Sequence, residues 1–562
     1  GRVEEISTSI HGREDITKDF ILDIVDDDDL MVKRKTIRKF ELDKVWYNSK
    51  TLFVAFEGVL YNLDELVNDG VGTTATEIIV RMFYKYGADF IKYLNGTFSG
   101  VIIEKEEEIV WIYTSHIAYR PIYYSVLDKQ VIFSTDIAWM YDTFNKNKIN
   151  LKIDSDGAYC LLSMGYMLDN KTIVQGINKV SSGEYVKIKA GKVERVQYWN
   201  IDEIQETNEP YDSLLEKADR LFCKAVSRLY DKDDSYNYNH VCTLSGGLDS
   251  RAIAMVADDM GYTKQIFVTF CESGMDDAKI SSKIAADLRQ EHFLYDLDNG
   301  LSYLDIDKAI YSTGGLIRFQ GFMPTRRLCE VLLNEKSGLL HTGEIGDVVF
   351  GGSFNHFNTK EWSIEFGAYS KVLLDKISVE FKNQLKKKYR TGKSYAIFNR
   401  GVNACEIGWL ASNCITESSS AFIDKEFMEF MLSVPDKFTN DSRFYIDWMK
   451  KYHPQMCKYV WTTTNSKPGA PKYYTMLKRT WRKVKHDVFK IKFNLNPFDF
   501  WYRDGSIMKL TFDTLFDNST RNSNINSGIL QDCLELYQNG SIYDKMLALT
   551  LIRAIYDFKI KI

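Results

Sequence analysis

One short stretch of this chain combines the residue types that hold phosphate groups. Directly after the apolar run 240–244 come Ser245, Gly246, Gly247, Leu248, Asp249 and Ser250. Adjacent glycines let the backbone come close to an anion, and the serine hydroxyls add donors. Asp249 would repel phosphates by itself, so its presence makes sense if a Mg²⁺ ion bridges the two. The stretch predicts a nucleotide-phosphate loop with magnesium; the alternative is an ordinary strand–turn–helix connection capped by Ser and Asp.

A second stretch repeats this pattern about a hundred residues later. Residues 339–352 read as an apolar strand followed by a glycine-rich turn that contains Gly343, Glu344 and Asp347. Two carboxylates at separate strand ends, Asp249 and Asp347, are expected to share the magnesium ion. Glu344 is expected in the same crevice.

The elements around these stretches alternate between helices and strands. We expect helices over 211–229, 248–260 and 277–289, and strands over 240–244, 265–270 and 292–297. This alternation is typical of a parallel sheet with crossover helices, in which ligands bind at the carboxyl ends of the strands. Beyond about residue 355 the pattern is mostly helical.

The first 200 residues have a different organisation. Short β-branched and aromatic runs predict strands over 51–56, 109–113, 122–124, 131–133 and 184–188, interrupted by one helical stretch over 75–90. Such runs, separated by turn residues, favour an antiparallel α+β domain. The acidic stretch 201–209 reads as a linker, so we expect one domain over 1–205 and a second, α/β domain over 206–562.

Composition narrows the function classes. The chain has 562 residues, enough for two or three domains, and its net charge of −5 argues against coating nucleic acid or an anionic membrane. It lacks an apolar run of about 18 residues, so we expect no membrane span and a cytoplasmic location. Its nine Cys form no C-x-x-C pair and its eight His are scattered, which predicts reduced core thiols and a metal held by carboxylates.

The two glycine-rich stretches resemble motifs of a known family. Ser-Gly-Gly-Leu-Asp-Ser is the pyrophosphatase-loop motif of ATP pyrophosphatases, and residues 342–352 look like the Gly-Glu-Gly-x-Asp-Glu-x-Phe-Gly-Gly block of asparagine synthetases, except at Ile345 and Val348. Residues 275–292 and 416–424 are similar to two further blocks, the latter without its Arg and Pro. The resemblance to the asparagine synthetase family covers nearly the whole chain.

In that family ATP adenylates a substrate carboxylate, pyrophosphate leaves, and an amine or ammonia attacks the acyl-adenylate. The resemblance implies ATP binding by Leu244, Ser245, Gly246, Gly247, Asp249, Ser250, Val268, Phe270 and Gly343. It implies Mg²⁺ binding by Asp249 and Asp347, and catalytic roles for Glu344 and Lys467. Lys467, in the segment 461–469, is the candidate for a lysine near the α-phosphate; the alternative is an exposed loop lysine.

The first domain resembles the glutamine-hydrolysing domain of the same family, an antiparallel sandwich of the Ntn-hydrolase type. The resembling segments are 57–62, 94–98 and 120–124. That class needs an N-terminal Cys as nucleophile, whereas this sequence begins with Gly1, although processing or a tag can hide a native N-terminus. Glu57 replaces an oxyanion-binding Asn, Val59 a Glu, and Ala75 an Asp that grips the substrate amine. We therefore expect a degenerate glutaminase that persists as a structural platform or a docking surface.

A silent glutaminase implies another source of the amine. The architecture resembles β-lactam synthetases and lasso-peptide cyclases, and Arg251 after the loop motif favours these relatives. We expect intramolecular amide formation in a peptide, with delivery by a partner protein left open. Alternatives are β-lactam closure, amidation of an amino-acid or sugar carboxylate by ammonia or another amine, a silent nucleotide-binding scaffold and a tRNA thiolase. The basic stretch 472–492 reads as a solvated helix face, or else as a site for an acidic peptide or tRNA.

Overall fold

The structure is a computed structural model that describes residues 3–4, 20–27, 30–413, 415–471, 473–478, 480, 496–521 and 528–562. Most of the basic stretch 472–492 lies outside these residues, so its role stays a prediction. Within the described ranges, every helix is too short or too polar to cross a membrane.

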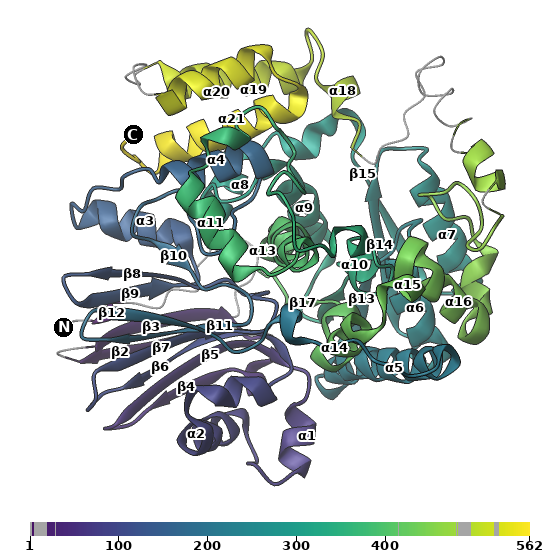
Figure 1. The fold of residues 1–562 in the computed structure, drawn as a ribbon, viewed down its shortest axis with the longest axis horizontal. Helices are drawn as coiled ribbons and strands as arrows, with labels where there is room; N and C mark the ends of the chain where they lie inside the picture. The colour runs from purple at the N-terminus through teal and green to yellow at the C-terminus, as the bar shows by residue number, and fades with distance from the viewer. Residues whose placement is uncertain are drawn as a thin grey trace.

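The N-terminal part is a sandwich of two six-stranded sheets (Figure 1). The first sheet has the order β10-β8-β9-β1-β3-β2, and the second has the order β12-β11-β7-β6-β5-β4. Pairing is antiparallel except where β1 joins β3 and β9. The strands are β1 (Val3–Glu4), β2 (Phe20–Asp27), β3 (Leu30–Ile37), β4 (Val45–Asn48), β5 (Leu52–Leu60), β6 (Gly96–Glu104), β7 (Ile109–Thr114), β8 (Tyr123–Leu127), β9 (Gln130–Ser134), β10 (Asn178–Lys179), β11 (Glu184–Lys189) and β12 (Lys192–Gln197).

Helices cover both outer faces of the sandwich and give it four layers (Figure 1). α1 (Leu63–Asn68) and α2 (Ala75–Tyr86) lie over the second sheet, whereas α3 (Ile137–Lys146) and α4 (Ser155–Met164) lie on the side of the first. The predicted antiparallel domain is confirmed, but the expectation of one helical stretch was wrong. Since α4 is buried on every side from Gly157 to Met164, its sequence lacks the polar face that marks a helix.

The C-terminal part is built on a parallel five-stranded sheet with the order β15-β14-β13-β16-β17. Its strands are β13 (Asn239–Thr243), β14 (Gln265–Cys271), β15 (Glu291–Asp296), β16 (Ser337–His341) and β17 (Ser418–Ser419). The helices α5 (Tyr211–Ser235), α6 (Asp249–Asp259) and α7 (Asp276–Leu288) alternate with them. The predicted alternation is confirmed, whereas the two-residue β17 lies in a region that we expected to be helical.

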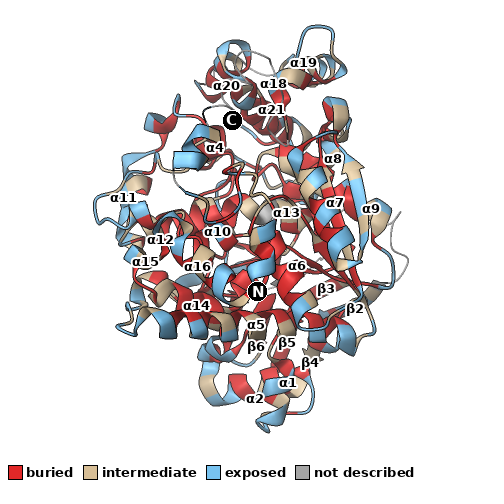
Figure 2. Ribbon diagram, turned by 90° about the vertical axis from the view of Figure 1, so that its right-hand side faces the viewer, coloured by how far each residue is buried: buried red, intermediate tan, exposed pale blue. Residues whose placement is uncertain are grey.

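The remaining helices close the molecule around this sheet. They include α8 (Ile306–Thr313), α9 (Phe322–Leu332), the π-helical turns η8 (Ala396–Asn403), α13 (Ala404–Ser412), α16 (Arg443–Tyr452), α19 (Ile507–Thr520), α20 (Gly528–Asn539) and α21 (Ile542–Asp557). α21 packs against both α4 and α8, so the end of the chain returns to the N-terminal sandwich. Figure 2 shows α6 and α21 largely in the colour of buried residues. One buried core runs through both parts of the chain.

Candidate active site

A cavity of about 310 Å³ lies where β13, β14 and β16 end. The strand register explains its position, because Thr243 pairs with Val268 on one side and Cys242 with His341 on the other. The carboxyl ends of three strands therefore meet at one edge of the sheet. Of the predicted site residues, the cavity is lined by Leu244, Ser245, Gly247, Asp249, Ser250, Val268, Phe270, Gly343 and Glu344.

The loop between β13 and α6 is fixed by hydrogen bonds to its own backbone. The Ser245 N–H donates to the Ser250 hydroxyl at 3.0 Å, and the Gly247 N–H donates to the Ser245 hydroxyl at 3.1 Å. The Gly246 N–H donates to Asp277 at 2.9 Å. A Cβ on Gly246 would lie 2.2 Å from Cγ2 of Thr462, so any larger residue would force the Thr462 side chain to move. Asp277 also lines the cavity and was missed, although an acidic residue in the first turn after a strand end is a usable signal.

The second loop lies directly against the start of α6. A Cβ on Gly343 would come within 2.4 Å of the Ser250 backbone nitrogen, and one on Gly346 within 2.7 Å of the Asp249 carboxyl carbon. This close approach brings Asp347 beside Asp249. Asp347 is exposed, and its Oδ2 accepts a hydrogen bond from the Ser353 hydroxyl at 2.9 Å. The structure therefore unites the two predicted metal carboxylates.

The protein satisfies only part of the Asp249 carboxyl group, although the Tyr445 hydroxyl and the Asp347 N–H both act to lower its pKa. Its Oδ1 is buried and accepts no hydrogen bond. Burial, and then the negative charge of Asp347, raise the pKa of Asp249 well above its ordinary value. A cation between the two carboxylates would offset both the burial of the Asp249 charge and its repulsion by Asp347. Carboxylate oxygens are suitable ligands for Mg²⁺. The donor set fits the magnesium ion that the sequence predicts.

Glu344 is held by three donors inside the cavity. Its Oε2 accepts hydrogen bonds from the Trp409 indole N–H, from the Tyr119 hydroxyl at 3.1 Å and from the Thr342 hydroxyl at 3.4 Å. The Tyr119 ring stacks on Trp409 with 3.7 Å between ring centroids. Burial raises the pKa of Glu344 to about 8, against the lowering effect of Tyr119 and Thr342. A carboxyl group with this pKa can accept a proton near neutral pH.

Tyr119 comes from the N-terminal sandwich, so this part of the chain supplies a hydrogen bond to Glu344, which lines the cavity. It stands just before the segment 120–124 that carries the family resemblance. Trp409 comes from α13, 65 residues beyond Glu344 in the sequence. Neither was predicted, because contacts over such separations leave no local pattern in a single sequence.

Lys467 is exposed and lies outside the set of described residues that line the cavity. Its segment is nevertheless anchored to the phosphate loop, because the Thr462 N–H donates to the Gly246 carbonyl at 3.2 Å. The fully buried Arg251 strengthens this link by donating to the carbonyls of Gly246 and Val460. Arg251 therefore joins two segments of the site, and the role of Lys467 stays a prediction.

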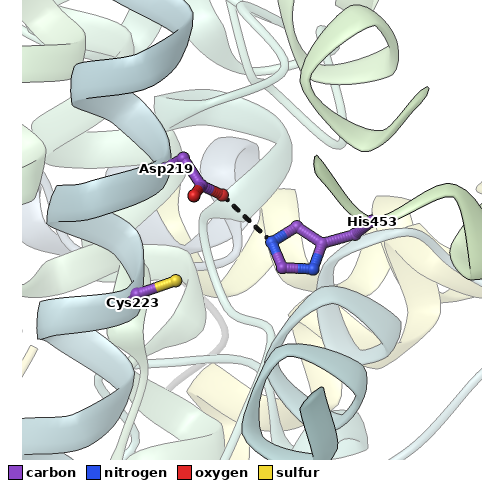
Figure 3. Close-up of side chains that lie close together, drawn as sticks. All are labelled: Asp219, Cys223 and His453. Atoms are coloured by element: carbon purple, nitrogen blue, oxygen red, sulfur yellow. Dashed lines mark hydrogen bonds and ion pairs between the residues drawn. The ribbon is translucent and has the colours of Figure 1, made fainter. Parts of the chain in front are cut away.

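Two further clusters of potential metal ligands lie apart from this cavity. Figure 3 shows the first, in which Asp219 and Cys223 lie one turn apart on α5 and face His453. His453 contacts Asp219 at 3.0 Å through Nε2 and Asp259 at 2.8 Å through Nδ1. Against burial, hydrogen bonds to Asp219, Cys223 and Asp259 raise the pKa of His453 to about 10. A charged imidazole between carboxylates explains this cluster without a metal.

The second cluster is fully buried. Asp233 accepts contacts from His240 at 3.0 Å and His341 at 2.8 Å, both through its Oδ2. Its Oδ1 accepts the Leu339 N–H at 2.8 Å. The carboxylate thus joins the end of α5 to β13 and β16, the two strands that carry the active-site loops. The hydrogen-bond pattern indicates a structural role.

Two family models match the chain. A glutamine amidotransferase domain matches residues 44–199, and an asparagine synthase domain matches residues 217–397. The chain thus contains an asparagine synthase domain over residues 217–397. The first match coincides with the sandwich, and the second contains both glycine-rich loops of the cavity. The resemblance read from the sequence is confirmed.

Similar proteins are found in an archaeon, a bacterium and a fungus. A Methanocaldococcus jannaschii protein with an asparagine synthetase name is 25% identical over 334 residues, which are 56% of this chain and 62% of that protein. Asparagine synthetase 1 of Bacillus subtilis is 22% identical over 258 residues, 44% of this chain and 39% of that protein. Amidase chyE of Penicillium rubens is 22% identical over 317 residues, 52% of this chain and 45% of that protein. The chain therefore spans about half the length of the curated relatives that it matches.

Proposed function

We propose that the protein is an ATP- and Mg²⁺-dependent carbon–nitrogen ligase that forms AMP. The observation that carries this proposal is the pair of carboxylates, Asp249 in the phosphate loop 245–250 and Asp347 beside it. Oδ1 of Asp249 is buried and lacks a hydrogen bond. A scaffold without turnover has no need for such a costly carboxylate pair. When bound, Mg²⁺ would spread the charge of the departing pyrophosphate.

The proposed reaction has two steps. A carboxylate oxygen of the substrate forms a bond to the α-phosphorus of ATP, and the bond from that phosphorus to pyrophosphate breaks. The loop N–H groups and the Ser245 and Ser250 hydroxyls orient the phosphates. An amine then attacks the acyl carbon, AMP leaves, and the amine proton passes to the Glu344 carboxylate. The pKa of about 8 supports this assignment, since the group is partly ionised at neutral pH.

We further propose that the N-terminal domain, bounded near residue 205, does not hydrolyse glutamine. Glu57 is buried, and its carboxylate accepts hydrogen bonds from Thr36 at 2.8 Å and from Arg34 at 3.3 Å. A fixed negative charge at a position where the family binds an oxyanion would oppose the reaction. The amine then comes from elsewhere, and we favour an amine of the substrate itself, in a peptide that is cyclised with or without a partner protein for delivery.

Pyrophosphate release tests the ligase proposal. Purified protein with ATP and Mg²⁺ is assayed against carboxylates, amines with carboxylates, and linear peptides, with AMP measured in parallel. We expect turnover with at least one class and its loss in Asp249→Asn. Asp258→Asn, near the other end of α6, is the matched control that should retain activity. Equal rates for Asp249→Asn and the wild type would refute the proposed role of the metal site.

A second assay addresses the N-terminal domain. Glutamine is added as the nitrogen donor, and glutamate release is measured with and without ATP. We expect none above a heat-treated control. Catalytic glutamate formation would refute the proposal that this domain is silent.

A further inference from the structure

The two carboxylate oxygens of Glu344 have different surroundings. Oε2 accepts hydrogen bonds from the Trp409 indole N–H and from the Tyr119 and Thr342 hydroxyls. Among the residues that the structure describes, no group donates a hydrogen bond to Oε1. This oxygen is not fully buried, and Glu344 is partly exposed and lines the cavity. The lone pairs of Oε1 are therefore available to a ligand.

Gly408 borders this open oxygen. A Cβ on Gly408 would lie 2.9 Å from Oε1 of Glu344, a distance at which carbon and oxygen atoms overlap. Both residues line the same cavity, Gly408 from α13 and Glu344 from the loop after β16. The carboxylate cannot turn aside without loss of hydrogen bonds, because Oε2 is held by three donors. A side chain at position 408 would therefore fill the space that faces Oε1 or displace the carboxylate.

The helix itself gives no reason for a glycine at position 408. Gly408 lies inside α13 and its φ is outside the left-handed region, so every L-residue can adopt its backbone conformation. Glycine in a helix interior is less favourable than alanine, because it loses more conformational freedom on folding. Gly401, in the preceding turns η8, is a contrasting case, because a Cβ there would lie 3.7 Å from its nearest non-local neighbours. What Gly408 provides is the free space at Oε1.

We propose that Gly408 is a specificity-determining residue whose missing side chain leaves a subsite for the attacking amine, bound in its protonated form by Oε1 of Glu344. This inference rests on the proposed ligase function, and it places the amine beside the carboxylate that is to take its proton. An ammonium group and a carboxylate form a charge-assisted hydrogen bond of about 2.7–2.9 Å. A Cβ at position 408 would stand at this distance from Oε1 and exclude the amine nitrogen. The ligand is thus a protonated primary amine, either free ammonium or an amine on a carbon atom of the substrate.

Thermal unfolding with added amine salts tests the subsite without any need for turnover. The probes are ammonium chloride and propylammonium chloride at tens of millimolar, with sodium chloride at equal ionic strength as the reference. The measurement is made at pH 9, because burial raises the pKa of Glu344 to about 8 and the charged carboxylate is needed. The proteins are the wild type, Gly408→Ala, Glu344→Gln and Gly401→Ala, the last a helical glycine that serves as the matched control.

The amine salts should distinguish these four proteins. We expect them to raise the midpoint of the wild type and of Gly401→Ala by at least about 1 °C beyond the effect of sodium chloride. Gly408→Ala and Glu344→Gln should lose this shift and retain the shift caused by MgATP. A shift with both amine salts would assign the subsite to an amine on a carbon atom, and a shift with ammonium alone would assign it to free ammonia.

The other binding results would overturn the proposal. Equal amine shifts in the wild type and in Gly408→Ala, or none in the wild type, would exclude a subsite at this glycine. Loss of the MgATP shift in Gly408→Ala would mean that the glycine serves the packing of the whole cavity instead.

Partial reactions separate the amine step from adenylation. In Gly408→Ala, amide formation should fall at least about tenfold, whereas carboxylate-dependent exchange of labelled pyrophosphate into ATP should stay within about twofold of the wild type. An equal loss of both would contradict the assignment of Gly408 to the amine. Absence of exchange and of pyrophosphate release in the wild type would refute the ligase proposal and leave the binding result intact.

Discussion

Removal of the Tyr119 hydroxyl should change the pH dependence of the ligase reaction. In Tyr119→Phe the ring remains stacked on Trp409, whereas the hydrogen bond to Glu344 at 3.1 Å is lost together with a weaker one from the Ser418 hydroxyl at 3.4 Å. That hydrogen bond favours the charged form of Glu344, because it lowers a pKa that burial raises. Its loss should therefore raise the pKa of Glu344 above about 8.

The size of the shift follows from the strength of the bond. A hydrogen bond to a charged group contributes about 1.5 kcal/mol or more, and one pKa unit corresponds to about 1.4 kcal/mol. The apparent pKa should thus move from about 8 to about 9. If ionised Glu344 is the proton acceptor, the variant should be roughly tenfold slower at pH 7 and nearly as fast as the wild type at pH 10. The rate ratio between the two proteins is therefore strongly pH-dependent.

The assay is the initial rate of pyrophosphate release from pH 6.5 to 10, with the best substrate from the panel. Tyr113→Phe is the control, since Tyr113 is also a buried tyrosine of the N-terminal sandwich and its hydroxyl has no hydrogen-bond partner. Tyr113→Phe should keep the wild-type profile. A Tyr119→Phe profile that is lowered by the same factor at every pH, or not lowered at all, would refute the proposal that Tyr119 tunes Glu344.

Three other substitutions have calculable effects on thermal stability. Glu344→Gln should be inactive but more stable than the wild type, by up to about 3 kcal/mol at pH 7 and by less than about 1 kcal/mol at pH 5. The reason is that the Glu344 carboxyl group of the unfolded wild type loses its proton above about pH 4.5, whereas the folded state keeps this proton up to about pH 8. Equal melting curves of the two proteins at pH 7 would contradict this prediction. Arg120→Met should cost about 3 kcal/mol, because it removes one of the two cations, Arg120 and Lys44, that pair with the buried Glu417. Arg120→Met with Glu417→Leu should recover only part of that loss, since Lys44 then loses Glu417 as a partner. A double variant no more stable than the single one would count against an ion-pair effect. His453→Asn should destabilise the fold most below about pH 6.5 and progressively less as the pH rises to about 10. The reason is that the His453 imidazole stabilises the fold only while it is charged, and its raised pKa keeps it charged up to about pH 10. A difference in melting temperature that is constant from pH 6 to 10 would exclude a charged imidazole.

The sequence predicts those parts of the site whose residues lie next to one another in the chain. The loop from Ser245 to Ser250 lies between a strand and a helix, and the loop that contains Glu344 and Asp347 also follows a strand and leads into a helix. Because parallel strands end at one edge of a sheet, two such loops on neighbouring strands must converge. The convergence of Asp249 and Asp347 could therefore be predicted before any contact was known.

The residues that sequence reasoning missed act across long separations. Tyr119 lies 225 residues before Glu344 in the sequence, and Trp409 lies 65 residues after it. In the sequence each is a single aromatic residue without a pattern around it. Their roles depend on the tertiary packing of α13 and of the sandwich, which no local period encodes.

The contact between Tyr119 and Glu344 also explains why a silent glutaminase domain would persist. The sandwich contributes a donor to the proposed proton acceptor, and the buried pair Arg120 and Glu417 ties the same loop to the residue just before β17. Truncation of the domain would remove the donor, expose the continuous core and leave Glu417 without Arg120. Under the proposal that the domain is silent, selection on the proposed ligase reaction alone would be enough to retain the sandwich, and the residues under strongest constraint should be those that contact the synthetase domain.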